Sequence, residues 1–293
     1  MHSVSKIKKQ TKRASPAVIT TISDVSPDDD FSPSHINSIS SSEHSFPLPE
    51  KGRTIDMLAG LFYQEELAVY NRFPEDGINF ELKKTIQHAH WRQKMCEWQY
   101  KVIDSVKLSR EVVFTSMSFT DRITKAHGCL DESFFRLISV VSLYVAMKLK
   151  HQKKVSASTL SKICGGYYSA KKICSMESFL LKTLEWYLHP PTPHSFVILL
   201  STFLPSSIGQ KKRTTIIKQA CYFCELATLD YFFVQIKPST ISFVCILEGM
   251  YGIKQECLDL FLFSLSEFKI ISGNPKHFQD ASSRLKKIIS ASC

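Results

Sequence analysis

The most suggestive chemical spacing in this chain is the pair Cys221 and Cys224, with two residues between them. Such a pair can supply half of a zinc site or act as a redox couple. Here it lies within a helical pattern, no second pair has this spacing, and the flanking residues lack the turn formers that would present two sulfurs to one ion. We therefore interpret both residues as core or boundary cysteines, one helical turn apart.

The sequence also lacks the short motifs that position groups for catalysis. It has no glycine-rich phosphate loop, no Gly-x-Ser-x-Gly elbow and no His-Glu-x-x-His pair. We therefore expect no enzyme activity, no metal and no cofactor.

The composition is that of an ordinary soluble globular protein, with 44% hydrophobic and 22% charged residues among 293. No run approaches the roughly 18–20 apolar residues of a membrane helix, since the longest, residues 137–147, ends at Lys148. The start of the chain has no apolar segment of a secretory signal. Nine cysteines, an odd number scattered through apolar segments, suggest reduced thiols. We expect an intracellular location, nuclear or cytoplasmic or both.

Residues 1–50 differ from the rest of the chain. They hold twelve serines and five prolines and have no aromatic residue before Phe31, so we expect a disordered regulatory tail. The basic cluster at residues 6–13 is typical either of a nuclear localisation signal or of a solvated basic tail. The remaining body carries 32 basic against 21 acidic residues, a net charge of +11. Such a body could face nucleic acid, a membrane surface or an acidic protein.

From about residue 54 onward the hydrophobic pattern is helical, so we expect an all-α fold. The expected helices span residues 54–70, 86–106, 110–126, 131–149, 157–166, 169–187, 193–203, 211–229, 238–251, 254–266 and 275–290. Segments 134–147 and 238–251 are apolar all round and should be buried. Each follows two amphipathic helices, which predicts a duplicated module joined at the proline-rich residues 189–193. The expected units are a tail over 1–50 and folds over 51–189 and 190–293.

Several segments, taken in order, resemble the cyclin family. The first four are Trp91–Trp98, like the opening of a cyclin box, Phe119–Arg122, Val145–Leu149 and Cys174–Leu181. In the second half, Glu225–Asp230 followed by Lys237-Pro238-Ser239 resembles the opening of a C-terminal cyclin fold. The resemblance covers roughly residues 54–265. It implies two tandem cyclin-like helical folds and a heterodimer with a cyclin-dependent protein kinase in cell-cycle control, with no membrane partner.

The resemblance also assigns roles to particular residues. Arg92 and Asp121 would form a structural ion pair between the first two helices of the cyclin box. Lys148 and Glu177 would face the kinase, with Lys148 donating to backbone carbonyls of its regulatory helix and Glu177 accepting from backbone N–H groups. The apolar residues packing on that helix would be Val145, Leu149, Leu181 and Leu188.

The first helix of the box would carry a patch that docks protein substrates. The patch residues would be Trp91, Met95, Trp98, Lys94 and Lys101. Lys101 replaces the acidic residue that usually receives a substrate's arginine. We therefore expect this chain not to select substrates through an arginine–leucine motif, although both lysines could equally be solvated surface charges.

Two other readings remain open. A nucleic-acid-binding protein like transcription factor IIB could use the same duplicated fold, and the +11 body favours it. That family carries an N-terminal zinc ribbon, however, and residues 1–50 contain no cysteine, so a nucleic-acid partner is disfavoured. A scaffold with the fold but without kinase activation is the other alternative.

Overall fold

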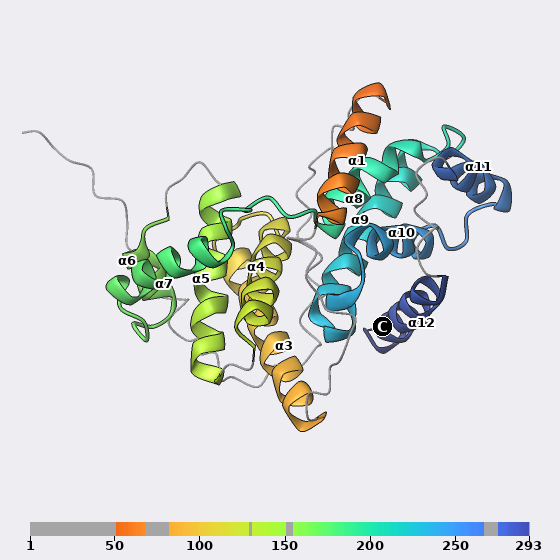
Figure 1. The fold of residues 1–293 in the computed structure, drawn as a ribbon. Coiled ribbons are helices and arrows are strands. Elements are labelled where there is room, and N and C mark those ends of the chain that lie inside the picture. Colours follow the sequence, from red (N-terminus) through yellow and green to blue (C-terminus); the bar gives the residue numbers. More distant parts are fainter. Residues whose placement is uncertain (1–50, 68–81, 129–130, 151–154, 267–274, 293) are drawn as a thin grey trace, which may run out of the picture.

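The computed structural model describes residues 51–67, 82–128, 131–150, 155–266 and 275–292, which form the helical fold of Figure 1. No strand occurs within these ranges. The prediction of an all-α protein is therefore confirmed. The expected tail and its basic cluster lie outside the described residues.

Helix α5 (Glu132–Lys150) runs through the centre of the first fold. Around it pack α3 (Leu82–Ser105), α4 (Glu111–His127) and α7 (Ala170–Thr183), and α6 (Ala157–Ile163) packs against α7. The buried side chains of α5 extend without a polar face from Leu137 to Met147, as the all-round apolar sequence predicts. Asp131 starts this helix, because its Oδ1 accepts a hydrogen bond from the Phe134 N–H at 2.8 Å.

Helix α10 (Pro238–Gly249) takes the corresponding central place in the second fold. It contacts α8 (Pro193–Leu200), α9 (Gln210–Leu229) and α12 (Pro275–Ser292), while α11 (Gln255–Leu265) packs on the short helix η3 (Ser201–Phe203). At Gly249 a Cβ atom would lie 3.0 Å from the carbonyl oxygen of Ile216, so glycine allows α10 to approach α9 closely. The predicted duplication of a helical module is therefore present.

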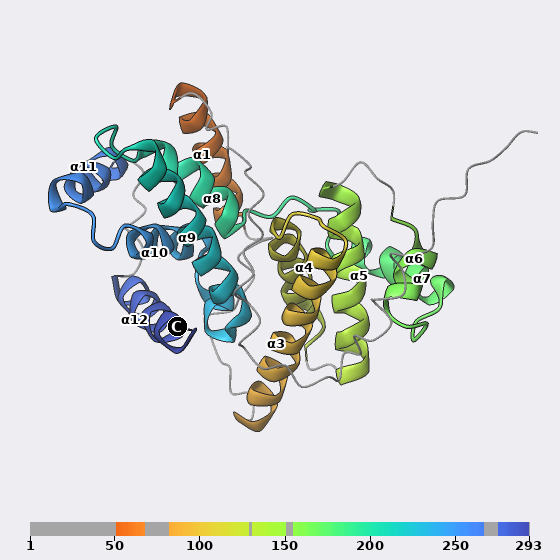
Figure 2. The same ribbon diagram turned by 180° about the vertical axis from the view of Figure 1, so that it is seen from behind.

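The two folds lie side by side, as the front and back views show (Figures 1 and 2). The linker enters α8 through Thr192, whose Oγ1 accepts from the Ser195 N–H at 3.2 Å, with Pro193 in the first turn. Helices α3 and α4 of the first fold contact α9 of the second. The folds therefore meet through helix packing as well as through the linker.

Helix α1 (Lys51–Glu66), which belongs to the unit expected over residues 51–189, lies against the second fold. It packs against α8, and Leu58 is fully buried in the core of the second fold. Leu61 and Phe62 extend the same stripe, and the Phe62 ring lies 5.1 Å from that of Phe196. The sequence predicts a helix here, but it contains no information about which fold the helix packs against.

Glu65, near the end of α1, completes the N-terminus of α10. The N-cap residue of α10, Lys237, makes no side-chain capping bond. Instead, Glu65 Oε1 accepts from the Ser239 N–H at 2.8 Å, and the Ser239 hydroxyl donates to Oε2 at 2.6 Å. A carboxylate at this position satisfies an otherwise unpaired helix N–H and interacts favourably with the helix dipole.

We expect Glu65→Ala to lower the free energy of unfolding by about 1–3 kcal/mol, because the Ser239 N–H loses its acceptor in a buried setting. Urea unfolding followed by circular dichroism measures this change. The control is Glu66→Ala, whose exposed carboxylate pairs with Lys237 and should contribute under about 1 kcal/mol. Equal losses in the two variants would contradict the capping role of Glu65.

The contribution of Glu65 to the free energy of unfolding should depend on pH. Burial raises the pKa of Glu65 above its ordinary 4.5, so the folded protein retains this proton at a pH where the unfolded chain has lost it. Stability should therefore decline as pH rises from about 4.5 through the raised pKa. Glu65→Gln, which does not titrate, should lack this component of the decline.

Candidate functional site

The ion pair expected between Arg92 and Asp121 is present and largely buried. Arg92 Nε donates to Asp121 Oδ1 at 2.8 Å and Nη2 donates to Oδ2 at 2.9 Å, with side-chain exposures of 4% and 14%. Burial alone would lower the pKa of Arg92, but Asp121 raises it. The guanidinium therefore remains charged between α3 and α4.

The third donor of Arg92 reaches the second fold. Its Nη1 donates to the carbonyl oxygen of Thr228 at 2.6 Å, near the end of α9. Arg110 makes a similar connection, with Nη1 donating to Glu225 at 2.6 Å while Nε and Nη2 bind Asp104. Both arginines therefore hold α9 against the first fold, a role that the sequence pattern did not predict.

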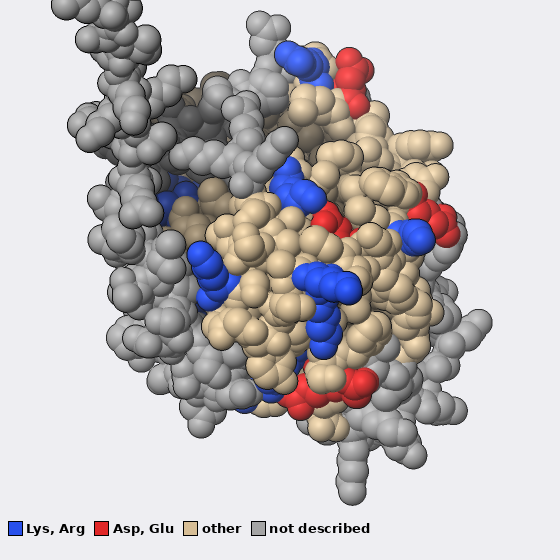
Figure 3. Space-filling model, turned by 90° about the vertical axis from the view of Figure 1, so that its left-hand side faces the viewer, with Lys and Arg blue, Asp and Glu red and all other residues tan. Residues whose placement is uncertain are grey.

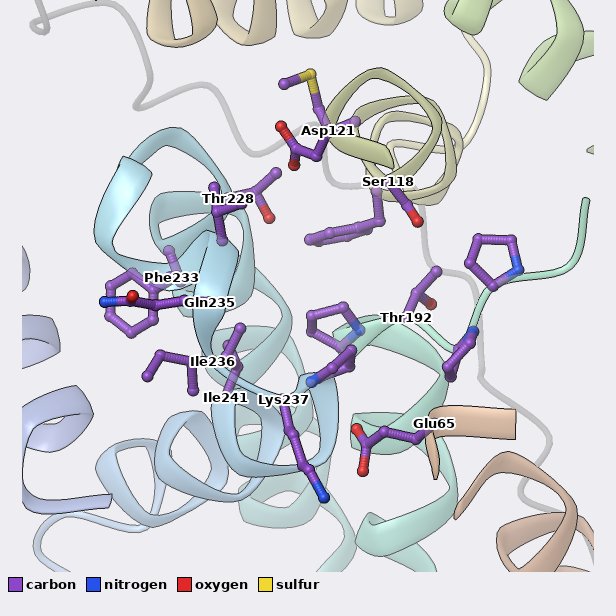
Figure 4. A pocket seen from close by; sticks show the side chains of 18 of the residues that line it. Glu65, Ser118, Asp121, Thr192, Thr228, Phe233, Gln235, Ile236, Lys237 and Ile241 are labelled. Carbon is purple, nitrogen blue, oxygen red and sulfur yellow. The ribbon is translucent and has the colours of Figure 1, made fainter. Parts of the chain in front are cut away.

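A cavity of about 150 Å³ lies between the two folds, bordered by α1, α4, the linker and the residues before α10. Figure 4 shows Asp121 and Ser118 on one side of it and Glu65 and Lys237 on another. Asp121 is bound to Arg92, Glu65 to Ser239 and Lys237 to Glu66. Each of these charged groups is therefore already paired with another residue where the two folds meet. We interpret the cavity as a gap in this packing.

The two residues expected to face a kinase lie together on the surface of the first fold. Lys148 Nζ, on the last turn of α5, lies 2.5 Å from Glu177 Oε1 on α7, and the side chains are 42% and 17% exposed. The Lys148 ammonium also sits 4.9 Å from the centre of the Tyr144 ring. The hydrogen bond to Glu177 raises the pKa of Lys148, so the lysine is fully charged at neutral pH.

The apolar residues expected beside this pair differ in accessibility. Leu149 is exposed, and Leu181 and Leu188 are partly buried against the core of the first fold. Val145, in contrast, is buried. It faces the core because α5 is covered on that side by neighbouring helices, so in this conformation it offers almost no surface to a partner.

The structure adds exposed aromatic residues that sequence reasoning missed. Trp186 is 68% exposed, and Tyr187 and Tyr167 are also exposed, next to α6 and α7. The expected helix over 169–187 ends at Thr183, because Glu185 and Trp186 adopt left-handed conformations with φ of 52° and 61°. Such conformations are uncommon for bulky residues and occur disproportionately at functional sites. Two bulky aromatics just before a proline-rich linker were the available sequence signal.

The expected substrate-docking patch is not an exposed apolar groove. Met95 and Trp98 are only 2% and 4% exposed and belong to the core of the first fold. Trp91 is partly buried near Phe135, and Lys94 and Lys101 are also partly buried. The apolar face of α3 must cover α5, which leaves little of it for a peptide.

Cys221 and Cys224 occupy the positions of core cysteines. Cys224 is fully buried and Cys221 partly so. Burial raises the pKa of both thiols, which disfavours the thiolate that a metal or a redox partner would need. Within the described ranges, no group of three or more His, Cys, Asp or Glu residues could hold a metal ion.

Membrane-spanning helices are likewise absent from the part of the chain that the structure describes. None of its helices combines the length and the apolar character that crossing a bilayer requires.

Known proteins resemble both folds. Residues 61–189 match the family model "Cyclin, N-terminal domain", and residues 191–291 match "Cyclin, C-terminal domain". Cyclin-A3-2 of Oryza sativa subsp. japonica is 25% identical over 70% of this chain and 53% of its own length. G1/S-specific cyclin-D2 of Mus musculus is 26% identical over 69% of this chain and 68% of its own length. The chain therefore spans about half the length of the rice relative.

Solved structures show the same fold. A viral cyclin from herpesvirus saimiri aligns with a TM-score of 0.61 at 15% identity, over 81% of this chain and 98% of the viral protein. A chain of the CAK complex of Chaetomium thermophilum bound to ATP-gamma-S aligns with a TM-score of 0.52 at 15% identity, over 82% of this chain and 76% of its own length. At this identity, the likeness concerns the arrangement of helices.

Proposed function

The chain belongs to the cyclin family, and from this premise we propose that it is a regulatory subunit that binds and activates a cyclin-dependent protein kinase in cell-cycle control. The observation that carries the proposal is the Lys148–Glu177 pair beside the exposed side chain of Leu149. A cation and a carboxylate at the edge of an apolar surface can bind the polar backbone groups at the end of a partner helix while the apolar residues cover its side. The names of the relatives, among them a G1/S-specific cyclin, support the same assignment.

The proposed mechanism is allosteric. A protein kinase holds the ATP phosphates correctly only when the glutamate of its regulatory helix pairs with a lysine in its β-sheet. Leu149, Leu181 and Leu188 would pack on that helix, together with the exposed ring of Trp186. Lys148 and Glu177 would exchange their mutual bond for backbone carbonyl and N–H groups of the kinase. A subunit that binds the paired conformation more tightly than the unpaired one shifts the kinase toward it.

A two-stage experiment tests this function. The tagged full chain is used to recover associated proteins from a eukaryotic lysate, and the kinase identified by mass spectrometry is then purified and assayed with a peptide substrate. We expect a one-to-one complex and a rise in phosphoryl transfer of at least about tenfold, equivalent to about 1.4 kcal/mol in the barrier. Stable binding without stimulation would instead indicate a scaffold, and no kinase binding would contradict the proposal.

We further propose that substrates are not selected through an arginine–leucine motif. Met95 and Trp98 are buried, and Lys94 and Lys101 place cations on the same helix, so a cationic peptide meets no apolar groove there. Fluorescence anisotropy with an arginine–leucine peptide should therefore show no saturable binding to the complex at micromolar concentrations. Micromolar binding that Lys101→Glu strengthens would show that α3 docks such peptides after all.

A further inference from the structure

Helix α7 ends in a backbone conformation that its sequence does not favour. The Trp186 N–H donates to the Leu181 carbonyl oxygen at 3.2 Å and the Glu185 N–H to that of Lys182 at 3.0 Å, a pair of bonds that ends many helices. The residue that follows such an end is usually glycine, because its φ is positive. Here it is Glu185, with φ of 52°, and Trp186 follows with φ of 61°. The turn is therefore left-handed at two successive residues that both carry long side chains.

Burial of the side chains does not hold this conformation. Glu185 and Trp186 are both exposed, Trp186 to 68%. Left-handed residues other than glycine are uncommon, and bulky ones persist only where surrounding groups fix them. Within the part of the chain that the structure describes, Lys107 is the one other non-glycine residue with a positive φ. A contact from another element is therefore expected at this turn.

Arg122, on α4, supplies such a contact. Its Nη1 donates to the Tyr187 carbonyl oxygen at 2.8 Å, and its Nη2 donates more weakly to the Leu184 carbonyl oxygen at 3.4 Å. These two carbonyls flank Glu185 and Trp186, so one guanidinium spans the whole turn. The guanidinium suits this role because it presents several N–H donors in fixed directions, which a lysine ammonium does not.

The turn follows directly on the surface proposed to bind the kinase. Leu181 comes four residues after Glu177 on α7, so the two side chains lie on one side of the helix. The turn begins just beyond Leu181, whose carbonyl oxygen accepts the Trp186 N–H. Figure 3 views the molecule from the α6–α7 end and shows charged side chains separated by uncharged surface. A partner that binds here therefore needs anchors other than ion pairs, and tryptophan is among the residues that most often supply them.

We propose that Arg122 is a positioning residue of the kinase-binding site, which holds the left-handed turn so that the Trp186 ring is presented to the partner before binding. This inference rests on the proposed function and adds a residue that acts without touching the kinase. A side chain already fixed in its bound conformation binds more tightly, because less conformational freedom is lost on association. Without Arg122 the turn would relax, and the ring would sample other orientations.

The affinity of single and double variants for the kinase tests this role. Isothermal titration calorimetry with the purified kinase should show at least about tenfold weaker binding for Arg122→Ala and for Trp186→Ala. Adding Arg122→Ala to Trp186→Ala should weaken binding by less than about a further twofold, because Arg122 acts through the ring. The control is Arg213→Ala, since Arg213 on α9 likewise donates to two backbone carbonyls, of Leu204 and Pro205, at 2.9 and 3.1 Å. This control should change the affinity by less than about twofold.

A rescue variant separates positioning from direct contact. Glu185→Gly favours the left-handed conformation without help from Arg122. Combined with Arg122→Ala, it should bring the affinity to within about threefold of that of Glu185→Gly alone. Circular dichroism of the free variants checks that the helices are retained. If Arg122→Ala loses helical signal, Arg122→Lys replaces it in both comparisons, because lysine keeps the charge but cannot span the turn.

The remaining outcomes contradict the inference. Unchanged affinity of Trp186→Ala would show that the ring is no anchor. Additive losses in the double variant, or no recovery with Glu185→Gly, would show that Arg122 contacts the kinase itself or only supports the fold. Equal losses for Arg122→Ala and Arg213→Ala would show that binding merely follows stability. In all of these cases the unchanged chain binds a kinase and the proposed function stands, whereas a chain that binds no kinase contradicts both.

Discussion

Asp121→Ala is expected to lower the free energy of unfolding by about 3–5 kcal/mol. The reason is that the substitution leaves the buried Arg92 without its counter-ion. Its guanidinium is 4% exposed and would lose both of the bonds that balance its charge, keeping only the Thr228 carbonyl. A buried charge without a counter-ion costs far more than the net contribution of the intact pair.

Urea unfolding of Asp121→Ala, Arg92→Ala and the double variant measures both the loss and the coupling between the residues. The double variant should be much more stable than the sum of the single losses predicts, because it leaves neither charge stranded. The control is Glu132→Ala, which breaks the more exposed pair with Arg136 one helical turn away and should cost under about 1 kcal/mol. Additive losses, or a loss for Asp121→Ala no larger than the control's, would show that the pair does not stabilise the fold in this way.

The helices of this protein could be predicted because their signals are local. The apolar residues of α5 and α10 recur on every side of the helix, which indicates burial whatever surrounds them. The N-terminal caps of α6 and α7 are likewise encoded nearby, in Ser156 and Ser169. Local signals fail at some helix ends. For example, α7 stops at Thr183 because the backbone of Glu185 and Trp186 is left-handed, although neither residue is a glycine.

Contacts between distant segments could not be predicted in the same way. The sequence predicts a helix where α1 lies but not that it covers the second fold, and the charge of Arg92 does not indicate that Nη1 reaches Thr228. Hydrophobic periodicity defines a face of a helix, whereas the neighbour of that face depends on how the helices pack.

In the candidate site, too, the placement of some residues could be predicted from the sequence and that of others could not. The resemblance assigns Lys148 and Glu177 to one surface, and the two side chains do lie together, because they are on helices that pack against each other. The same reasoning placed Val145, Met95 and Trp98 on binding surfaces, but these side chains are buried. An apolar residue that packs on a partner and one that fills the core have the same sequence signature, and only the three-dimensional arrangement separates them.

The second large effect is expected for the kinase rather than for the fold. Lys148→Ala together with Glu177→Ala should weaken kinase binding by at least about a hundredfold, because each residue would lose charge-assisted hydrogen bonds to the partner helix, about 1.5–3 kcal/mol apiece. The free protein should be little affected, since a pair this exposed contributes under about 1 kcal/mol to stability. Isothermal titration calorimetry with the purified kinase, alongside thermal unfolding of the free chain, measures both quantities.

A matched control exists in the second fold, where Lys286 and Glu248 form a comparable pair at 3.4 Å. Replacing both with alanine removes the same two charges far from α7 and should leave kinase affinity within about twofold. The single variants add a further check, because Lys148→Ala leaves Glu177 without its partner and Glu177→Ala does the same to Lys148. If the pair served only to join α5 to α7, each single variant would reduce stability and kinase affinity together. If it binds the kinase as proposed, affinity falls while the unfolding temperature remains almost constant, and unchanged affinity in the double variant would remove the basis for placing the kinase on this surface.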